Sequence, residues 1–361
     1  MAETCRQFLV RKDDLHTVRW ASEPLPDLPW GSVLLQLERA GFTANNVTYA
    51  VRGENLFWRF FPAPDGWFRF PVWGFAVVAR SRAAGVSEGD RFYGYLPISS
   101  HLTLEVDEVT PAGFTVADAH RRDLPAIYNL YHGTAADPTY LPDREAEQAL
   151  LRPVFRTSFM LDDYLADNGF FGARRVILGS ASSKTALGLA FMLSRKRRPD
   201  IEVVGLSAST NLGFLQRLGW FDRVTAYEDL ASLSAETPSA YVDMSGNAEV
   251  RAGLHDHLGD ALRFDARVGS THWSRMDERP PQGVQPQLFS MAEQMKKRTA
   301  EWGLSEIQRR LQEDWRAFLE TTNDWLELNE VRGDAAVEAV YREMIGGGAK
   351  PWQGHLLSLA D

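Results

Sequence analysis

The sequence predicts an α/β protein that combines a helix-covered parallel sheet with a separate β-rich domain. The chain has 361 residues, enough for two domains that each bury a core of their own. Strands and helices alternate between residues 176 and 268, whereas the first 150 residues contain mainly short strands. We therefore expect a β-rich domain over 1–151, a helix-covered sheet domain over 152–290, and a helical segment, 291–361, that returns to the first domain.

Four segments of the first domain have the apolar or alternating pattern of strands: 33–38, 75–80, 91–96 and 102–106. From 123 to 143 this pattern weakens into a polar segment that carries several tyrosines. Long segments of this kind in a compact protein are usually functional or mobile.

The second domain contains a series of short apolar strands, each followed by a turn and a helix. We expect strands at 176–178, 203–206, 224–226, 240–244 and 261–268, with the main helices at 145–151, 157–168, 184–194, 211–218 and 248–258. Such alternation indicates a parallel sheet with helices on both faces. A long helical region, 291–321, broken near Trp302 and Gly303, and a helix at 334–344 complete the chain.

The turn after the first of these strands is the most informative motif. The strand ends at Gly179, small residues follow, and a helix begins near Lys184, as in a Rossmann-type dinucleotide-binding unit. Small residues let a pyrophosphate approach the backbone, and the helix N-terminus offers free N–H groups. Hydroxyl side chains replace most of the usual glycines, so we expect cofactor contacts from Gly179, Ser182, Ser183, Lys184 and Thr185. A P-loop is disfavoured because Leu178 and Ser183 occupy its two glycine positions.

The residues after the second strand indicate which dinucleotide binds. An NAD-selective site normally has an acidic residue there, for the ribose 2′-hydroxyl, and the sequence Ser207-Ala208-Ser209-Thr210-Asn211 has none. Hydroxyl and amide groups suit a 2′-phosphate, so we expect NADP(H), bound with the help of Ser207, Ser209 and Asn211. The alternative is that these residues only cap the next helix, for which serine, threonine and asparagine are equally suited.

Composition excludes several classes of protein. A net charge of −9 argues against a nucleic-acid-binding surface. The single cysteine, Cys5, excludes an internal disulfide and a cysteine-built metal cluster. No signal-peptide core or apolar run of about 18 residues occurs, so we expect a cytoplasmic protein that does not span a membrane.

Several stretches together resemble the medium-chain dehydrogenase/reductase superfamily over nearly the whole chain. They are VLLQLERAG (33–41), Asn45-Asn46, GVSEGDRFYGY (85–95) and NLGFLQRLGWFDRVTAY (211–227). The set TANNVTYA, PVWGFA, SASSKTA and THW resembles an uncharacterised bacterial branch of that superfamily. The resemblance implies a GroES-like first domain, a Rossmann-type second domain, an NADP-dependent oxidoreductase and a homodimer.

The zinc ligands of that superfamily are missing from this sequence. Its Gly-His-Glu position reads Gly74-Phe75-Ala76, and the four-cysteine lobe is absent. His255 and His257, two residues apart on an expected helix, point to different faces. We therefore expect no metal.

Three clusters offer donors that would polarise a substrate oxygen. Asn46 and Tyr49 belong to a loop that faces the cleft in relatives, unless it is a plain polar loop. Thr271 and His272 follow a strand that ends beside the nicotinamide in this fold. Tyr131 lies in the 123–143 segment, which either closes over the cleft or only packs on its neighbours. An aromatic set near the cleft indicates either core packing or a bulky, aromatic substrate: Phe57, Trp58, Phe60, Phe61, Trp67, Trp73 and Trp273.

These expectations lead to a zinc-independent, NADPH-dependent reductase of an enone, enoyl or quinone-type small molecule. Two alternatives stay open: a lyase or retro-aldol-type enzyme on the same scaffold, and a sensor that binds a dinucleotide without turnover. Fold alone does not choose among them.

Overall fold

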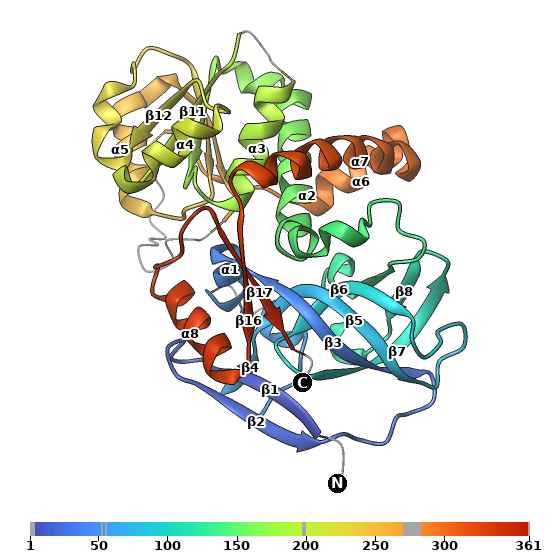
Figure 1. The fold of residues 1–361 in the computed structure, drawn as a ribbon. Helices are drawn as coiled ribbons and strands as arrows, with labels where there is room; N and C mark the ends of the chain where they lie inside the picture. Colours follow the sequence, from blue (N-terminus) through green and yellow to red (C-terminus); the bar gives the residue numbers. More distant parts are fainter. Residues whose placement is uncertain (1–3, 52, 55, 197–199, 270–282, 360–361) are drawn as a thin grey trace. The chain divides into compact units, whose positions relative to one another are not determined.

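The structure is a computed structural model, and it describes residues 4–51, 53–54, 56–196, 200–269 and 283–359. The chain forms two compact units, drawn in Figure 1. Unit 1 comprises residues 1–152 together with 326–361, and unit 2 comprises residues 153–325. The chain therefore leaves unit 1 once and returns to it once.

Unit 1 is built around an eight-stranded sheet with the order β16-β17-β3-β5-β6-β9-β8-β7. A further pairing joins β3 to β7, so that six of these strands form a closed ring. The strands span β3 Ser32–Phe42, β5 Pro71–Ser81, β6 Arg91–Pro97, β7 His101–Thr110, β8 Gly113–Val116, β9 Leu130–Gly133, β16 Glu327–Arg332 and β17 Gln353–Ser358. The four strands expected from the sequence lie within β3, β5, β6 and β7.

A second sheet in unit 1 has three strands, in the order β2-β1-β4. They span β1 Thr4–Arg11, β2 Val18–Pro24 and β4 Trp67–Arg69, and two helices, α1 Val47–Val51 and α8 Asp334–Ile345, belong to the same unit. The tyrosine-bearing segment 123–143 contains β9, so part of it is a strand of the closed ring.

Unit 2 contains a six-stranded parallel sheet with the order β12-β11-β10-β13-β14-β15. The strands are β10 Arg175–Gly179, β11 Glu202–Ser207, β12 Arg223–Ala226, β13 Ser239–Asp243, β14 Leu262–Arg267 and β15 Gln287–Leu288. Every residue of β10 and β13 is buried, as expected for strands with helices on both faces. The order in space reverses beside β10, which is the switch point where Rossmann-type sheets bind ligands.

Helices α3 Lys184–Arg195, α4 Leu212–Leu218 and α5 Ala248–Leu258 connect these strands. Two apolar clusters form the core of the unit: one contains Leu178 and Leu189, the other Ile177 and Leu254. Because Ile177 and Leu178 are consecutive in β10, the two clusters lie on opposite faces of the sheet.

Two features of the helices differ from the sequence-based expectation. A single helix, α2 Glu145–Asp167, replaces the two expected ones and continues through Pro153. The segment 291–325 belongs to unit 2, so the return to unit 1 begins at Leu326 and not at 291. Helix α6 (Met291–Trp302) is held to α2 by Arg298, whose Nε donates a hydrogen bond to Asp163 at 2.6 Å. Helix α7 (Leu304–Thr321) contributes Phe318, whose ring packs on those of Phe155 and Phe191.

Helix α2 approaches β3 so closely at Gly41 that only glycine fits there. A Cβ atom added to Gly41 would lie 2.4 Å from the backbone carbonyl carbon of Ala149. We expect Gly41→Ala to lower the free energy of unfolding by about 1–3 kcal/mol, because backbone cannot move aside as a flexible side chain can. Urea titration would measure the change.

Gly133→Ala is the matched control in the same unit. A Cβ atom there would be 3.6 Å from its nearest neighbour, an ordinary contact with Phe92. Equal stability of the Gly41→Ala and Gly133→Ala variants would contradict the argument.

Candidate functional site

The turn between β10 and α3 has a tightly constrained backbone. Ser180 adopts a φ of 52°, which is uncommon for a residue other than glycine. A Cβ atom on Gly179 would lie 2.5 Å from the Oη of the buried Tyr241, so glycine is required at the end of the strand. Ser183 is the N-cap of α3, and its side chain accepts a hydrogen bond from Ala186 N. The turn before α3 is therefore compact and ends in a side-chain cap at Ser183, and the helix N-terminus that follows is the kind of site where phosphates bind.

Three polar side chains meet at the carboxyl ends of β10 and β11. The Oγ atoms of Ser182 and Ser207 are 3.2 Å apart, and the Nδ2 of Asn211 donates to these oxygens at 3.1 and 3.4 Å, respectively. We call Ser182, Ser207 and Asn211 the hydroxyl–amide cluster. It places hydroxyl and amide groups, and no carboxylate, at the switch point of the sheet.

The other residues expected around this turn have separate positions. Ser209 is exposed, in a short 3-10 helix that precedes α4. Thr185 is buried, and its backbone carbonyl accepts a hydrogen bond from Ser158 Oγ at 2.7 Å. Thr271 and His272 lie outside the described residues.

Lys184, the first residue of α3, is directed into the interior. Its side chain is buried, and its Nζ lies 5.6 Å from the ring centroid of Trp325, within the range of a cation–π contact. Burial lowers the pKa of Lys184 to about 7. The amine therefore changes its charge near neutral pH.

The sequence analysis missed Tyr227, which follows β12. Burial raises the pKa of its phenol above the ordinary value, and hydrogen bonding to Ser180 acts in the opposite direction. Tyr227 therefore contacts the turn at Ser180. The available signal was its position directly after a strand, at the same edge of the sheet as Ser182 and Ser207.

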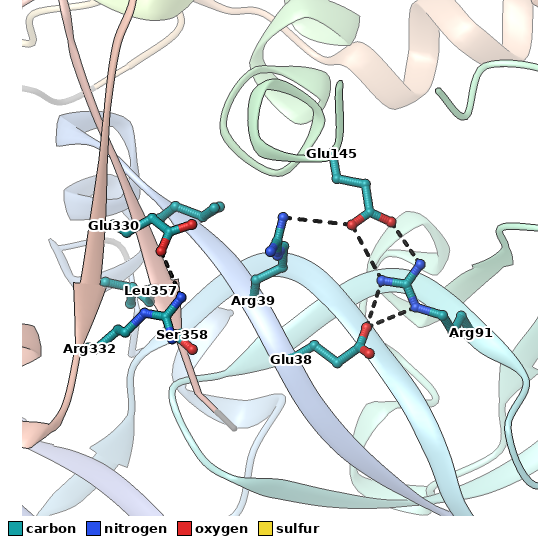
Figure 2. Close-up of a pocket in the computed structure, with 9 residues that line it drawn as sticks. Glu38, Arg39, Arg91, Glu145, Glu330, Arg332, Leu357 and Ser358 are labelled. Carbon is teal, nitrogen blue, oxygen red and sulfur yellow. Dashed lines mark hydrogen bonds and ion pairs between the residues drawn. The ribbon is translucent and has the colours of Figure 1, made fainter. Parts of the chain in front are cut away.

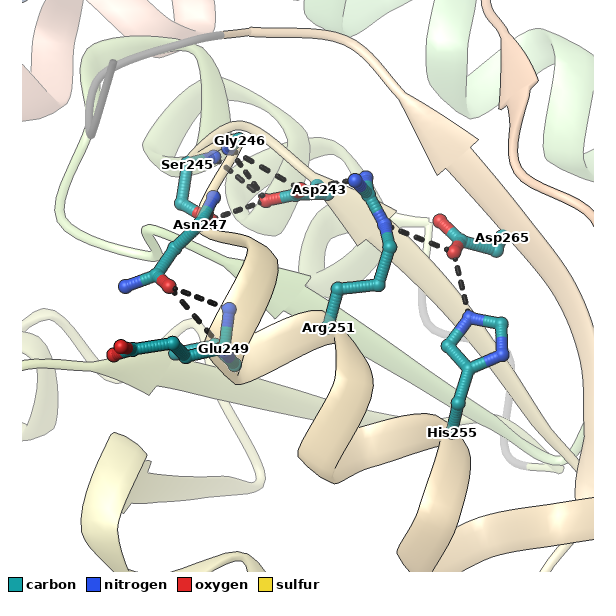
Figure 3. Close-up of polar contacts among 9 residues, drawn as sticks. Asp243, Ser245, Gly246, Asn247, Glu249, Arg251, His255 and Asp265 are labelled. Atoms are coloured by element: carbon teal, nitrogen blue, oxygen red, sulfur yellow. Dashed lines mark hydrogen bonds and ion pairs between the residues drawn. The ribbon is translucent and has the colours of Figure 1, made fainter. Parts of the chain in front are cut away.

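The carboxyl end of β13 is fixed by a buried network of charges, shown in Figure 3. Asp243 accepts hydrogen bonds from Ser245 N at 2.7 Å and from the guanidinium of Arg251 at 2.6 Å. Arg251 also donates to Asp265 at 3.0 Å, and His255 Nε2 lies 2.8 Å from the same carboxylate. Both carboxylates are completely buried, so Arg251 compensates charges that water does not reach.

In unit 1, Tyr49 lies on α1 with its hydroxyl oxygen accepting a hydrogen bond from Trp73 Nε1 at 2.9 Å. Its ring packs against Phe57 and Tyr95. Burial raises the pKa of Tyr49 to about 12, so the phenol keeps its proton at neutral pH. A protonated phenol can donate a hydrogen bond to a substrate oxygen.

Two other expected catalytic residues serve the structure of unit 1. The Oδ1 of Asn46 accepts a hydrogen bond from Thr43 N at 2.9 Å and so completes a capping box. Tyr131 is 1% exposed, its hydroxyl donates to the backbone carbonyl of Tyr95, and its ring stacks on Phe114. Because Tyr131 is a buried residue of the strand ring and not of a lid, we leave it out of the proposed site.

The aromatic residues of unit 1 pack on one another. Contacts of 4.7–5.8 Å between ring centroids join Tyr49, Phe57, Phe60, Phe61, Trp73, Tyr95 and Tyr128. Trp58 stacks instead on Phe68. Core packing accounts for these contacts without a ligand.

Within the described parts of the chain, no group of three or more histidine, cysteine, aspartate or glutamate side chains is arranged to hold a metal ion. Phe75, at the position of the superfamily's zinc-ligand motif, is fully buried. None of the helices that the structure describes is both long and apolar enough to cross a membrane.

The sequence of residues 40–350 matches the family model "Protein of unknown function (DUF2855)". The chain belongs to this family. No curated protein matches the DUF2855 chain in sequence. Its family name assigns no activity, so fold and site geometry carry the functional argument.

Solved structures similar to the DUF2855 chain include CurA from Vibrio vulnificus in complex with NADPH, at 12% identity and a TM-score of 0.63 over 99% of each chain. A putative NADPH:quinone reductase from Bacillus thuringiensis matches at 12% identity and a TM-score of 0.58, over 99% of each chain. The yhdH oxidoreductase from Salmonella enterica in complex with NADP matches at 14% identity and a TM-score of 0.56. The match covers 98% of this chain and 99% of the yhdH chain. The chain has the medium-chain dehydrogenase/reductase fold, as its sequence predicts.

Arg251 is the residue on which the buried network depends. We expect Arg251→Met to lower the free energy of unfolding by about 3–5 kcal/mol, because two buried carboxylates lose their cationic partner. Arg263→Met, at an exposed position near the start of β14, should change the free energy of unfolding by less than about 0.5 kcal/mol. Similar denaturant midpoints for the two variants would refute this role for Arg251.

Lys184 makes the stability of the protein depend on pH. Between pH 7 and 10.5 the unfolded chain holds a proton on Lys184 that the folded chain has released, so the contribution of Lys184 to stability rises with pH. We expect Lys184→Met to be more stable than the wild type at pH 7, and the difference to shrink by about 2–4 kcal/mol by pH 10.

Chemical denaturation of both proteins at pH 7 and pH 10 would measure this change. Lys296→Met, at an exposed position of α6, is the control and should show no such dependence. A pH-independent difference between wild type and Lys184→Met would rule out a buried, titrating amine.

Proposed function

We propose that this protein is a zinc-independent, NADPH-dependent reductase of an enone, enoyl or quinone-type small molecule. The hydroxyl–amide cluster at the switch point carries the proposal. Its donors suit a 2′-phosphate, whereas an NAD-selective site would present a carboxylate that accepts from the ribose hydroxyl. The NADPH and NADP complexes of CurA and yhdH, which share the fold, support the same cofactor.

The described residues fit a dinucleotide at the start of α3. The turn before this helix consists of small residues, and the first turn of α3 offers backbone N–H groups and a positive dipole end to a pyrophosphate. We assign the pyrophosphate to Gly179, Ser182, Ser183 and Thr185, with Lys184 contributing through its backbone at the first position of α3. Ser207, Ser209 and Asn211 are assigned to the adenosine side, and Tyr227 borders it. The bound cofactor would supply hydride.

The substrate oxygen needs a donor when hydride adds to a conjugated carbonyl, because negative charge develops on that oxygen. Tyr49, whose phenol remains protonated at neutral pH, is the proposed donor in unit 1. We also propose His272 and Thr271 for the site, from their sequence positions after β14. Asn46 would act through its position beside Tyr49, since its carbonyl oxygen is engaged by Thr43.

We propose further that the protein works as a cytoplasmic homodimer on small molecules, without nucleic-acid or membrane partners. Light scattering at micromolar concentration tests the dimer, and a monomer there would contradict it.

Cofactor selectivity is the direct test of the hydroxyl–amide cluster. We expect tighter binding of NADPH than of NADH, and a loss of about tenfold or more in NADPH affinity for Ser207→Asp, because the new carboxylate repels a 2′-phosphate. NADH affinity should be maintained or improved. Fluorescence titration with both dinucleotides measures these affinities.

Ser207→Asn is the control, since it has a similar size and no charge. Should wild type bind NADH as tightly as NADPH, or Ser207→Asp retain full NADPH affinity, the assignment fails. Binding without oxidation of NADPH by any enone or quinone would favour the sensor over the reductase.

The proton-donor assignment is tested on a substrate that supports turnover. We expect Tyr49→Phe or His272→Ala to lower kcat by about 10²-fold, the scale of one general acid, while NADPH affinity stays unchanged. Tyr131→Phe is the control, because its hydroxyl bonds to the backbone of Tyr95. If Tyr49→Phe and His272→Ala both turn over normally, neither residue is the donor.

A further inference from the structure

Unit 1 contains a small pocket lined by charges of both signs, shown in Figure 2. Its volume is about 150 Å³. Drug-sized ligands need about 300 Å³ or more, so this pocket fits only a small metabolite. The lining residues are Glu38, Arg39, Arg91, Glu145, Glu330, Arg332, Leu356, Leu357 and Ser358.

One side of the pocket is already saturated with hydrogen bonds. Arg91 donates to Glu38 at 2.7 and 2.9 Å and to Glu145 at 2.7 Å, and Tyr140 also bonds to Glu145. Burial acts to raise the pKa of the Glu145 carboxyl group. Hydrogen bonds from Arg91 and Tyr140 outweigh this effect and hold the pKa below its ordinary value. This side forms a fixed wall and has no donor to spare.

Arg39 differs from the other two arginines of the pocket. Its guanidinium donates no hydrogen bond to any residue that the structure describes, and its nearest acidic oxygen, on Glu145, is 3.8 Å away. Figure 2 shows Arg39 between the Arg91–Glu145 pair and the Glu330–Arg332 pair. Arg39 therefore has its planar set of donors available for a carboxylate.

The opposite wall is formed by β16. Arg332 donates to Glu330 at 2.8 Å, but the two side chains are 73% and 56% exposed. Ion pairs this exposed contribute little to stability, so a ligand can replace one partner at low cost. The pKa of Glu330 is lowered chiefly by Arg332 and to a smaller extent by the charge of Arg39, so Arg39 acts on this wall too.

The positive and negative side chains that line the pocket indicate what charge its ligand carries. Three arginines and three glutamates line the pocket. A simple anion beside Arg39 would be repelled by Glu145 and Glu330, and a simple cation beside Glu330 would be repelled by Arg39 and Arg332. A ligand with both charges avoids each repulsion.

We propose that this pocket binds a small zwitterion of the α-amino-acid class. The carboxylate pairs with Arg39, the ammonium group pairs with Glu330, and Leu356, which is paired with Glu330 across β16 and β17, contacts a short apolar side chain. This site lies within unit 1, and its ligand is independent of the proposed cofactor.

The test is calorimetric titration of the full-length protein with L-alanine, at low ionic strength and without a dinucleotide. Acetate and methylammonium, each carrying one of the two charges, are the comparison ligands. We expect saturable binding of L-alanine and affinity at least about tenfold weaker for either single-charge ligand. Absence of saturable L-alanine binding, or equal binding of acetate, would overturn the proposal.

Arg39→Gln and Glu330→Gln should each weaken L-alanine binding about tenfold or more. Arg11→Gln is the matched control, because Arg11 is an exposed arginine of unit 1 that pairs with Asp13, and it should bind normally. Unchanged affinity in Arg39→Gln would overturn the proposal. Should that variant fail to fold, Glu330→Gln on the exposed strand gives the same test. Because no turnover is measured, the outcome does not depend on the reductase proposal.

Discussion

A parallel sheet covered on both faces leaves only the strand ends for polar side chains, and this constraint shapes unit 2. Every residue of β10 and β13 is buried, so a polar group inside either strand would need a buried partner. Polar residues accordingly lie where the strands end, at Ser207, the last residue of β11, and Asp243, the last residue of β13. Residues far apart in the sequence thus meet along one edge.

The same constraint explains which parts of the fold could be predicted. Buried strands of a parallel sheet read as apolar runs, which is why 176–178 and 203–206 were found within β10 and β11. Short strands such as β8 and β9 were not predicted, because the apolar pattern of four residues is too short to distinguish a strand from a loop. The assignment of 291–325 was wrong because the ion pairs and aromatic contacts that hold α6 and α7 to unit 2 leave no local signal in the sequence.

The sequence could indicate that some residues of the candidate site lie close together, but it could not indicate others. Ser182, Ser207 and Asn211 each lie near the end of an expected strand, and the structure brings them together. Tyr227 has a similar position but was read as part of a family motif. The Asp243–Arg251–Asp265 network joins two strands to a helix, and the charges around Arg39 come from four separate segments. Such clusters depend on tertiary contacts that residue spacing does not encode.

The pairing of β17 with β3 has a consequence for how the chain is made. His355–Ser358 pair with Arg39–Phe42, so β3 meets this neighbour only after roughly 310 further residues have been added. At about 5–20 residues per second, the ribosome needs about 15–60 s for that interval. Unit 2 is contiguous in sequence and emerges within it, so it can fold while one edge of the earlier sheet still lacks its neighbour. An unpaired strand edge invites association with other chains. Translation therefore exposes the N-terminal half to aggregation for longer than the segment inserted into it.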